Sequence, residues 1–349
     1  MPLRALLNNS YIFSFNYDEK GWNELKKNPL FMPCCHEKAI PKRSKLGTFF
    51  FSHYRKGICT SKPESEDHLF LKNLIAKVAV NEGWEVETEY RGETPGKEIW
   101  IADVLCKKGK AKLAFEIQCS PQSYEEFIRR QKNYASSGVR GAWFYKRSKR
   151  VASKFGSEIP NEHSTPVFLF ELNQNEPNEF VVPQFNETIE SFIRGMLNGK
   201  LIWVPKKGDA LTANVIATYE RCWKCKKETG ILLGVEIKDR FGQLCTFERF
   251  DNPGILDFLR KQLGQEFFLK SKIGQIKKRY SNTVKEAYLS NGCFYCNALF
   301  GDFYIFETLA EFGCDLPDPL ISFNFMYDGV SPEIDGRWFF DGKPAEIEI

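Results

Sequence analysis

The chain of 349 residues has no apolar run of the length that a membrane-spanning helix needs. Its N-terminus also lacks the apolar segment and the small-residue cleavage site of a secretory signal. These absences predict a soluble cytoplasmic protein with no membrane partner. In that compartment, paired cysteines more often bind metal or carry out redox chemistry than form structural disulfides.

The end of the chain, from Cys314, is acidic and aromatic and has no repeat or low-complexity pattern, and the formal net charge of the chain is only +4. A charge this small does not by itself indicate a polyanionic partner. Whether the chain can bind one depends on how its basic residues are clustered. The length and the apolar content suffice for about two domains with cores of their own. This excludes a small module held together by disulfides.

A β-hairpin is predicted near the centre of the first half of the chain. Residues 99–106 and 112–117 are rich in apolar and β-branched side chains, and the basic segment 107–110 between them contains Gly109. Two such runs joined by a short, glycine-containing turn are typical of antiparallel strands.

Two acidic residues interrupt this hairpin. A turn centred on residues 108–109 sets Asp103 across from Ala114. Since side chains alternate with a period of two, Asp103, Glu116 and Gln118 then share one face of the sheet. Two carboxylates on an apolar sheet are costly to bury unless a cation neutralises them, and such hard oxygen ligands suit Mg²⁺ or Mn²⁺. The alternative is an exposed face with two hydrated acids.

A helix is predicted before the hairpin, from Pro63 with its following acids to about Gly83. Glu64, His68 and Lys72 are spaced four apart, so they stack on one face of this helix. From that face they could lean over the hairpin acids. A solvated charged helix face is the alternative interpretation.

Further elements are predicted on both sides of the hairpin. Residues 84–90 alternate as a strand, and residues 121–137 form a helix closed by Gly138. Residues 141–145 are a short buried strand, and residues 167–172 are the last strand of the domain. Strand, helix and strand would make one right-handed crossover.

Basic residues follow the strand at 141–145, beside Trp143 and Tyr145. Cations bind phosphates and aromatic rings stack on bases, so this pattern favours a groove that follows a nucleic-acid backbone. The alternative is a solvated surface. The residues are Lys146, Arg147, Lys149, Arg150 and Lys154.

Together these pieces resemble the competence protein CoiA-like family within the PD-(D/E)XK nuclease superfamily. The resemblance covers roughly residues 25–175. It implies an α/β (α+β) fold with a restriction-endonuclease-like core. The matching residues are Glu64-Ser65, His68, Lys72, Ala102-Asp103-Val104, Glu116-Ile117-Gln118-Cys119-Ser120, Arg130 and Tyr134.

The same resemblance implies a divalent-metal-dependent deoxyribonuclease in DNA processing, in transformation and recombination or in defence. Asp103, Glu116 and the carbonyl of Ile117 would hold Mg²⁺ or Mn²⁺. The resemblance also assigns nucleic-acid contacts to two further residues, Arg130 and Tyr134. The implied catalytic set is Asp103, Glu116, Gln118, Glu64, His68 and Lys72.

Gln118 departs from the superfamily pattern, in which a lysine stands at this position. A glutamine supplies neither positive charge nor a titratable amine, so we expect it to orient a water molecule. The missing cation would come from Lys72, His68 or Lys112. This departure keeps a second interpretation open, a DNA-binding or adaptor protein on a nuclease scaffold that has lost catalysis.

Residues 1–60 are predicted to form a small β-rich module. At this position the CoiA-like family often has a CxxC pair, whereas here Cys34 and Cys35 are adjacent, a spacing that rarely suits one tetrahedral ion. A zinc site from Cys35, His53 and Cys59 is one interpretation. Buried structural cysteines with a core histidine are the favoured one.

Two CxxC pairs in the second half, Cys222 with Cys225 and Cys293 with Cys296, supply the four thiolates of a structural zinc site. A redox dithiol would leave one pair unexplained. A zinc-organised module for protein partners, without nucleic acid, is a third interpretation of the chain. The segment between the pairs carries a basic stretch, namely Lys270, Lys272, Lys277, Lys278 and Arg279.

The sequence therefore predicts four segments, with a polar linker at 173–183 and an amphipathic helix at 189–197. The segments are an N-terminal module (1–60), a nuclease-like core (61–175), a linker and helix (176–210), and a zinc-binding C-terminal domain (211–349).

Overall fold

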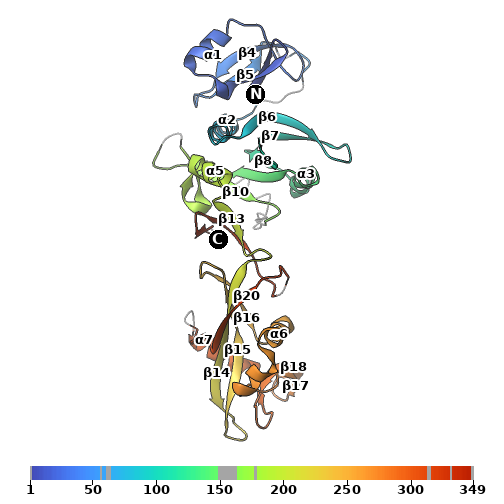
Figure 1. The fold of residues 1–349 in the computed structure, drawn as a ribbon, viewed down its shortest axis with the longest axis vertical. Helices are drawn as coiled ribbons and strands as arrows, with labels where there is room; N and C mark the ends of the chain where they lie inside the picture. The colour runs from blue at the N-terminus through green and yellow to red at the C-terminus, as the bar shows by residue number, and fades with distance from the viewer. Residues whose placement is uncertain are drawn as a thin grey trace. The chain divides into compact units, whose positions relative to one another are not determined.

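The computed structural model describes residues 2–55, 57–59, 64–147, 163–176, 179–312, 316–330 and 332–346. Within these residues the chain is a mixed α/β protein with six α-helices and several sheets. It divides into two compact units (Figure 1), Met1–Ile202 with Arg337–Ile349, and Trp203–Gly336. No described helix is long and apolar enough to cross a membrane.

The first unit begins with a five-stranded sheet in the order β2-β1-β3-β4-β5. One helix, α1 (Glu19–Leu25), packs on it through Trp22, whose ring stacks on Phe49 with centroids 4.7 Å apart. Asp18 caps this helix by accepting a hydrogen bond from the backbone N–H of Gly21. The strands are β1 (Arg4–Leu7), β2 (Ser10–Phe13), β3 (Leu30–Phe31), β4 (Lys38–Arg43) and β5 (Phe49–His53).

A seven-stranded sheet in the order β12-β11-β10-β9-β8-β7-β6 forms the main body of the first unit. Strands β6, β7 and β8 are an antiparallel meander, and β9 is parallel to both β8 and β10. The strands are β6 (Glu85–Glu93), β7 (Ile99–Lys108), β8 (Ala111–Gln118), β9 (Arg140–Lys146), β10 (Val167–Leu172), β11 (Phe180–Val182) and β12 (Glu187–Thr188).

Helices cover both faces of this sheet. Trp143 and Phe144 are neighbours on β9 and point to opposite faces. Trp143 packs against Phe127 of α3 (Tyr124–Ser136), while Phe144 packs against Phe192 of α5 (Ile189–Leu197). Helix α2 (Glu66–Asn81) lies beside α5, because Arg194 of α5 pairs with Glu82 at the end of α2. Thus α2 and α5 cover one face and α3 covers the other.

Several predicted elements agree with the structure. Strand β10 and helix α5 have the predicted bounds, and Gly138 follows α3 with φ +66°. The segment 173–183 differs from the prediction, since it contains β11, which pairs with β10 and extends the sheet. Its Asn and Pro content suggested a linker, but a strand of only three residues leaves little periodicity to detect.

The chain returns to the first unit at its end. Strands β21 (Arg337–Phe340) and β22 (Lys343–Pro344) form a hairpin, and Phe340 packs on Phe192 of α5 with ring centroids 4.9 Å apart. Residues 337–346 therefore belong to the first unit, whereas the predicted C-terminal domain ran from 211 to 349 without a break.

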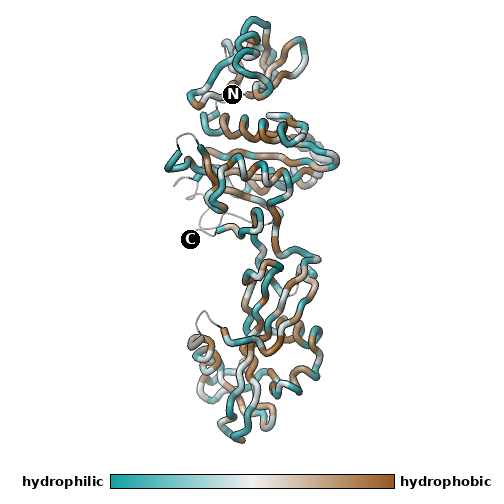
Figure 2. Tube along the Cα trace, turned by 60° about the vertical axis from the view of Figure 1, so that its left-hand side comes forward, coloured by the Kyte–Doolittle hydropathy of each residue, from teal (hydrophilic) through white to brown (hydrophobic). Residues whose placement is uncertain are grey.

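The second unit is built on a four-stranded antiparallel sheet in the order β16-β15-β14-β20, with a smaller sheet, β17-β18-β19, beside it. Hydrophobic residues occur along these strands (Figure 2), and burial alternates over the first half of β14, whereas β15 is buried over most of its length. Its elements are β14 (Ala210–Arg221), β15 (Glu228–Lys238), β16 (Leu244–Arg249), α6 (Pro253–Lys270), β17 (Lys277–Ser281), β18 (Glu286–Gly292), β19 (Leu299–Phe300), α7 (Asp302–Phe312) and β20 (Ile321–Met326).

Candidate active site and metal centres

The antiparallel register of β6, β7 and β8 places Glu89, Asp103 and Glu116 at one level across three strands. The expected register of the hairpin is off by two residues, because Leu105, not Asp103, pairs with Ala114. A two-residue turn at Gly109 and Lys110 explains the shift, and Asp103 stands opposite Glu116 instead. We refer to Glu89, Asp103 and Glu116 as the acid row.

Asp103 lies where strands β7 and β8 separate. Its Oδ2 accepts a hydrogen bond from the backbone N–H of Ile117 at 2.9 Å and lies 3.1 Å from Nε2 of His68 on α2. The other ring nitrogen, Nδ1, is 3.3 Å from Oε2 of Glu64. Burial lowers the pKa of His68, but the two flanking carboxylates outweigh it and raise the pKa to about 9. The imidazolium in turn holds the pKa of Asp103 below its ordinary value, against the effect of burial.

Lys72 is fully buried on α2 and neutralises two carboxylates. Its Nζ donates to Oε2 of Glu64 at 2.7 Å and to Oε1 of Glu89 at 2.5 Å. Burial alone would lower the pKa of this amine, but the two acids raise it above its ordinary value. Arg4 of the N-terminal sheet also contacts Glu89, with its Nη2 donating to the backbone carbonyl at 2.8 Å.

The sequence-based prediction missed Glu89, which stands in a regularly alternating strand segment. In the structure, Glu89 has φ +48° and leaves the pairing ladder between β6 and β7. Such a backbone conformation is uncommon for a residue other than glycine and tends to occur at functional positions. No signal in the sequence distinguishes Glu89, because Glu85 and Glu87 precede it at the same alternating spacing.

Glu116 is buried and is held by two residues of α3. Nη2 of Arg130 is 2.6 Å from its Oε2, and the hydroxyl of Tyr134 donates to its Oε1. Burial and, to a smaller extent, the nearby charge of Asp103 raise the pKa of Glu116, while Arg130 lowers it. The net result is a pKa of about 8. Tyr134 is fully buried, so its ring contacts the core and not a bound strand.

The two acids of the hairpin are thus held from opposite sides of the sheet. Asp103 bonds to α2 and Glu116 bonds to α3, and both residues lie where the pairing of β7 with β8 ends. The expectation of one shared face, which followed from ideal alternation, is therefore wrong. The break in the ladder at Asp103 alters that alternation, yet it leaves the two charges close enough to affect each other.

Gln118 does not point at the acid row. Its Nε2 donates to the backbone carbonyl of Ser120 at 2.5 Å. Lys112 is exposed and pairs with Lys107 near the hairpin turn, about 13 Å along the strand from Glu116. Of the expected sources of positive charge, the structure therefore brings His68 and Lys72 to the acids and leaves Lys112 away.

The basic segment after β9 is only partly described. Lys146 pairs with Asp67, and Nη1 of Arg147 lies 3.2 Å from Oε1 of Glu171. Trp143 and Tyr145, expected to interleave with these cations, are buried in the core and present no ring for stacking. Lys149, Arg150 and Lys154 lie outside the described residues.

Two groups of three or more metal-ligating side chains occur among the described residues, and both consist of cysteine and histidine. The first is the predicted set in the second unit. The sulfurs of Cys222 and Cys296 are 3.6 Å apart, as are those of Cys225 and Cys293. A tetrahedral ion with Zn–S bonds of about 2.3 Å needs sulfurs roughly 3.7 Å apart, so this group can bind zinc.

The backbone around Cys222 favours the thiolate form of this one ligand, whereas at Cys296 a backbone hydrogen bond from Ala298 lowers the pKa but the neighbouring sulfurs raise it overall. Although burial raises it, hydrogen bonds from the backbone N–H groups of Cys225 and Lys224 lower the pKa of Cys222 to about 6. A thiolate is the form that ligates zinc. The fold thus stabilises the ligand form of Cys222 in advance.

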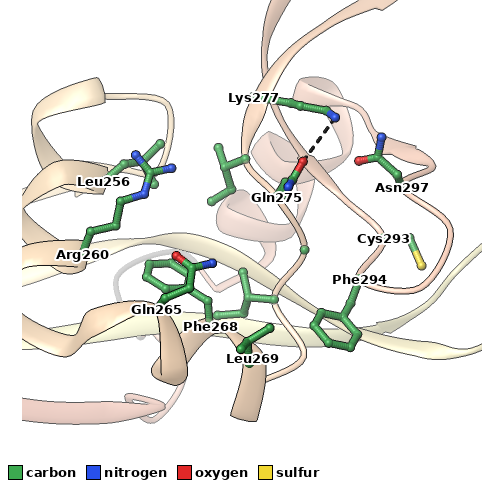
Figure 3. A pocket seen from close by; sticks show the side chains of 13 residues that line it. Leu256, Arg260, Gln265, Phe268, Leu269, Gln275, Lys277, Cys293, Phe294 and Asn297 are labelled. Carbon is green, nitrogen blue, oxygen red and sulfur yellow. Dashed lines mark hydrogen bonds between the residues drawn. The ribbon is translucent and has the colours of Figure 1, made fainter.

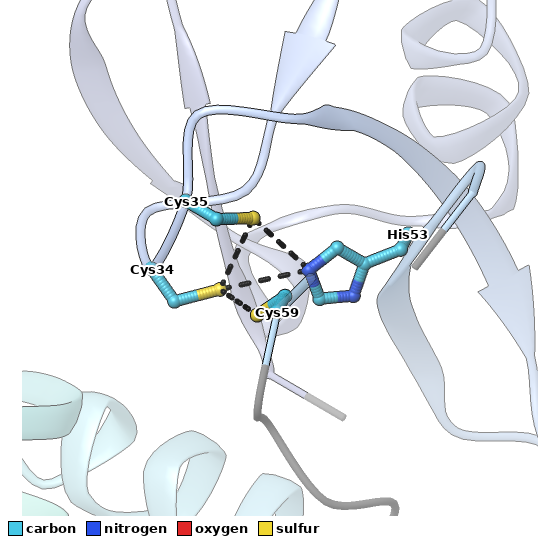
Figure 4. A group of neighbouring side chains, drawn as sticks. All are labelled: Cys34, Cys35, His53 and Cys59. Atoms are coloured by element: carbon cyan, nitrogen blue, oxygen red, sulfur yellow. Dashed lines mark hydrogen bonds between the residues drawn. The ribbon is translucent and has the colours of Figure 1, made fainter. Parts of the chain in front are cut away.

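The second group lies in the N-terminal module and joins Cys34, Cys35, His53 and Cys59 (Figure 4). The sulfur of Cys34 is 3.6 Å from that of Cys59 and 3.7 Å from that of Cys35, and Nε2 of His53 is 3.2 Å from Cys35. This group can also bind zinc. The favoured sequence-based interpretation, buried structural cysteines, is wrong for Cys34, which is exposed and completes the set.

Backbone geometry explains how adjacent cysteines fit one site. In each CxxC turn the first cysteine accepts a hydrogen bond from the residue four positions on, a residue with positive φ: Lys226 in one turn and Asn297 in the other. Met32 to His36 forms the same turn, with His36 donating to Met32 at 2.9 Å and having φ +57°. Met32 therefore occupies the first cysteine position, and Cys34 supplies the sulfur from within the turn.

Residues 64–194 match the family model described as competence protein CoiA, nuclease-like domain. This match contains the acid row, α2, the hairpin and α3, and it confirms the resemblance predicted from the sequence. No curated protein matches the chain.

Proposed function

We propose that residues 64–194 act as a divalent-metal-dependent nuclease on DNA, with the helix, meander, helix and strand around the acid row as a PD-(D/E)XK core. The observation that carries the proposal is that Asp103 and Glu116 lie on adjacent strands, each one residue beyond the end of the pairing between β7 and β8, inside a segment that matches a nuclease-like family. The family match also supports a role in handling DNA that enters the cell, in transformation, recombination or defence.

The donor set suits Mg²⁺ or Mn²⁺. Asp103, Glu116 and the backbone carbonyl of Ile117 would hold the ion, which when bound would orient a water and neutralise charge on the attacked phosphate. The residues around them supply the remaining charge. His68 and Lys72 place two cations on the α2 side, and Glu64 fixes both of them.

Both metal-binding acids must exchange partners in this proposal. Asp103 would release His68, and Glu116 would release Arg130 and Tyr134. The freed imidazolium and guanidinium would then face the phosphate that enters the site, where each can donate hydrogen bonds to its oxygens. Contacts to the DNA backbone outside the site would come from Lys146 and Arg147, together with Lys149 and Arg150.

The test is cleavage of single- and double-stranded DNA with Mg²⁺ or Mn²⁺, and without added metal. We expect Asp103→Asn and Glu116→Gln each to reduce cleavage by roughly 100-fold or more, because the charge stabilisation lost is worth several kcal/mol. DNA binding should remain close to that of the parent. Cys106→Ser on the same strand, outside the acid row, is a control. Metal-independent cleavage, or parent-like cleavage by both acid variants, would overturn the proposal.

A second function is DNA binding without cleavage. It is favoured by one observation: the acid row is already neutralised by Lys72, His68 and Arg130, while Gln118 bonds to Ser120 and contributes no cation. Gln118→Lys distinguishes the two. If the protein is a nuclease in which Gln118 positions water, Gln118→Lys should cleave DNA as the parent does. If the protein only binds DNA, neither the parent nor Gln118→Lys should cleave it.

A further inference from the structure

The two cysteine turns of the second unit carry exposed aromatic rings. Trp223 lies between Cys222 and Cys225 and is 61% exposed, and Tyr295 lies between Cys293 and Cys296 and is 44% exposed. One turn therefore presents an indole to solvent and the other a phenol.

Both rings are held in place by the fold. Nε1 of Trp223 donates to the backbone carbonyl of Leu299 at 3.0 Å, which ties the indole of the first turn to the strand after the second. Tyr295 is packed edge-on against Phe294 and lies under Nζ of Lys227, 4.8 Å from the ring centroid. Rings fixed in this way lose little conformational entropy on binding a flat partner.

Cations surround these rings. The first turn and its flanks, residues 221–227, contain four basic residues and no acid, and their side chains are exposed. Lys272 joins them from another segment, since its backbone carbonyl accepts from Gly230 at 2.9 Å and its side chain is exposed. The nearest exposed acid in sequence is Glu228. The basic residues are Arg221, Lys224, Lys226, Lys227 and Lys272.

Not every basic residue of the predicted stretch is available. Arg279 donates to the carbonyls of Ser290 at 2.6 Å and Gln275 at 2.7 Å and also bonds to Asn297, so it braces the second cysteine turn. Burial lowers its pKa, as expected of a structural arginine. Lys277 and Lys278 remain exposed on β17.

A cavity of about 620 Å³ adjoins the second turn (Figure 3). Phe294 and Asn297 of that turn line it, and Arg260 and Lys277 bring positive charge to its walls. Amide groups of Gln265 and Gln275 lie among apolar side chains there. The cavity can accept a polar, flat group next to a cation.

We infer that the two cysteine turns form a binding platform for single-stranded nucleic acid, with bases stacked on Trp223 and Tyr295 and phosphates bound by Lys224, Lys226, Lys227 and Lys272. The combination of fixed, exposed rings with surrounding cations favours single-stranded nucleic acid over an acidic protein or a duplex. An acidic protein would need the cations but not the rings, whereas a single strand uses both. A duplex hides its base faces and leaves the rings unused.

This platform is independent of hydrolysis at the acid row, so its test uses no Mg²⁺ or Mn²⁺. Binding of a fluorescent oligo-dT of about 20 nucleotides to the full chain is measured by anisotropy at several salt concentrations. We expect Trp223→Ala and Tyr295→Ala each to weaken binding about tenfold, the usual cost of losing one stacked base. Combined Lys224→Ala, Lys226→Ala and Lys227→Ala should reduce the slope of log K against log salt by roughly 2.

The opposite end of β15 offers a matched control. Arg240 lies over the ring of Phe241 at 5.1 Å, a cation and aromatic pair like that of Lys227 and Tyr295. Arg240→Ala with Phe241→Ala should bind oligo-dT as the parent does. Zinc content and melting temperature of every variant establish that the fold is intact.

Two outcomes would overturn the inference. If folded Trp223→Ala and Tyr295→Ala variants bind oligo-dT like the parent, no base stacks on these rings. If heparin, a polyanion without bases, competes equally with parent and ring variants and the lysine variant alone loses binding, the surface serves an acidic partner. A parent that binds oligo-dT in this way but cleaves no DNA would leave the platform intact and reject only the nuclease.

Discussion

The cysteine clusters and the acid row both gather side chains that prefer a cation, yet they are balanced in different ways. In the cluster of Cys222, Cys225, Cys293 and Cys296, sulfurs face sulfurs, and no basic side chain lies between the paired atoms. In the acid row, every carboxylate already has a basic partner from the chain itself. Lys72 forms an ion pair with Glu89, His68 with Asp103, and Arg130 with Glu116.

Under the proposed function, this difference separates a structural metal from an exchangeable one. Four thiolates at contact distance would repel each other, so an ion bound during folding would stabilise their arrangement. The acid row is stable without a metal, because its charges are compensated internally. A divalent ion there must compete with protein cations, which suits a site that binds metal together with an anionic substrate.

The largest expected effect comes from breaking the cysteine cluster. Cys222→Ser should lose the zinc of the second unit and destabilise that unit by several kcal/mol, because zinc binding contributes directly to folding free energy. Metal analysis and thermal unfolding measure both changes. Cys245→Ser, in the same unit but outside the cluster, should retain zinc. If Cys222→Ser is zinc-free but as stable as the parent, the cysteine cluster does not need metal for stability, and it does not differ from the acid row in this respect.

The next effect tests internal compensation in the acid row. Lys72→Met should destabilise the first unit by about 3–5 kcal/mol at pH 7, since it leaves Glu64 and Glu89 without their buried cation. Chemical denaturation measures the loss, and Lys77→Met on the exposed side of α2 is the matched control. Adding Glu89→Gln to Lys72→Met should recover part of the stability. An unchanged free energy of unfolding in Lys72→Met would show that the lysine is not needed to balance the acids.

The two kinds of site also differ in how far the sequence predicts them. The cysteine turns and the hairpin depend on local spacing, so Cys222, Cys225, Asp103 and Glu116 could be named in advance. Their partners could be named only in part, since His68 and Lys72 were expected beside the hairpin acids but Arg130 was not expected to pair with Glu116. Arg130 pairs with Glu116 only because α3 crosses β8 after the parallel connection, and no residue spacing encodes that contact.

Two failures of prediction have one physical origin. Glu89 joins the acid row through a positive φ, and Cys34 joins its cluster through a turn in which Met32 takes the usual place of cysteine. Backbone conformation decided both, while motif spacing described only the commonest solution. The number of strands in the seven-stranded sheet was also underestimated, because its last two strands, β11 and β12, have only three and two residues.

The pH dependence of stability gives a third effect. His68 has its pKa raised to about 9 in the fold, so the stability it contributes is present below pH 6.5 and is lost as the pH rises to about 9. Ionisation of Glu116, whose pKa is raised to about 8, acts in the same direction. Without added divalent ions, we expect the free energy of unfolding to fall by roughly 4 kcal/mol between pH 6.5 and 9.

His68→Gln separates the two contributions. It removes the titration of the imidazole but retains an amide that can donate to Asp103, so the decrease above pH 7 should become shallower. Glu116→Gln should instead remove the decrease at lower pH. A pH profile that neither substitution changes would mean that the charges of the acid row do not respond to pH as its geometry implies.

The smallest effect compares the two cysteine clusters with each other. Cys34→Ser should weaken zinc binding in the N-terminal module about tenfold or more, as measured by competition with a chelator, because an exposed thiolate ligand is lost. The cluster of the second unit serves as an internal reference, since its four cysteines are unchanged. Adding Met32→Cys should restore part of the affinity, because Met32 holds the turn position that Cys222 and Cys293 hold elsewhere. The restored affinity will be incomplete, because Met32 is buried in the core of the module and its shortening leaves a cavity. If Met32→Cys restores nothing, the three turns share a backbone path but not the direction in which the first side chain points.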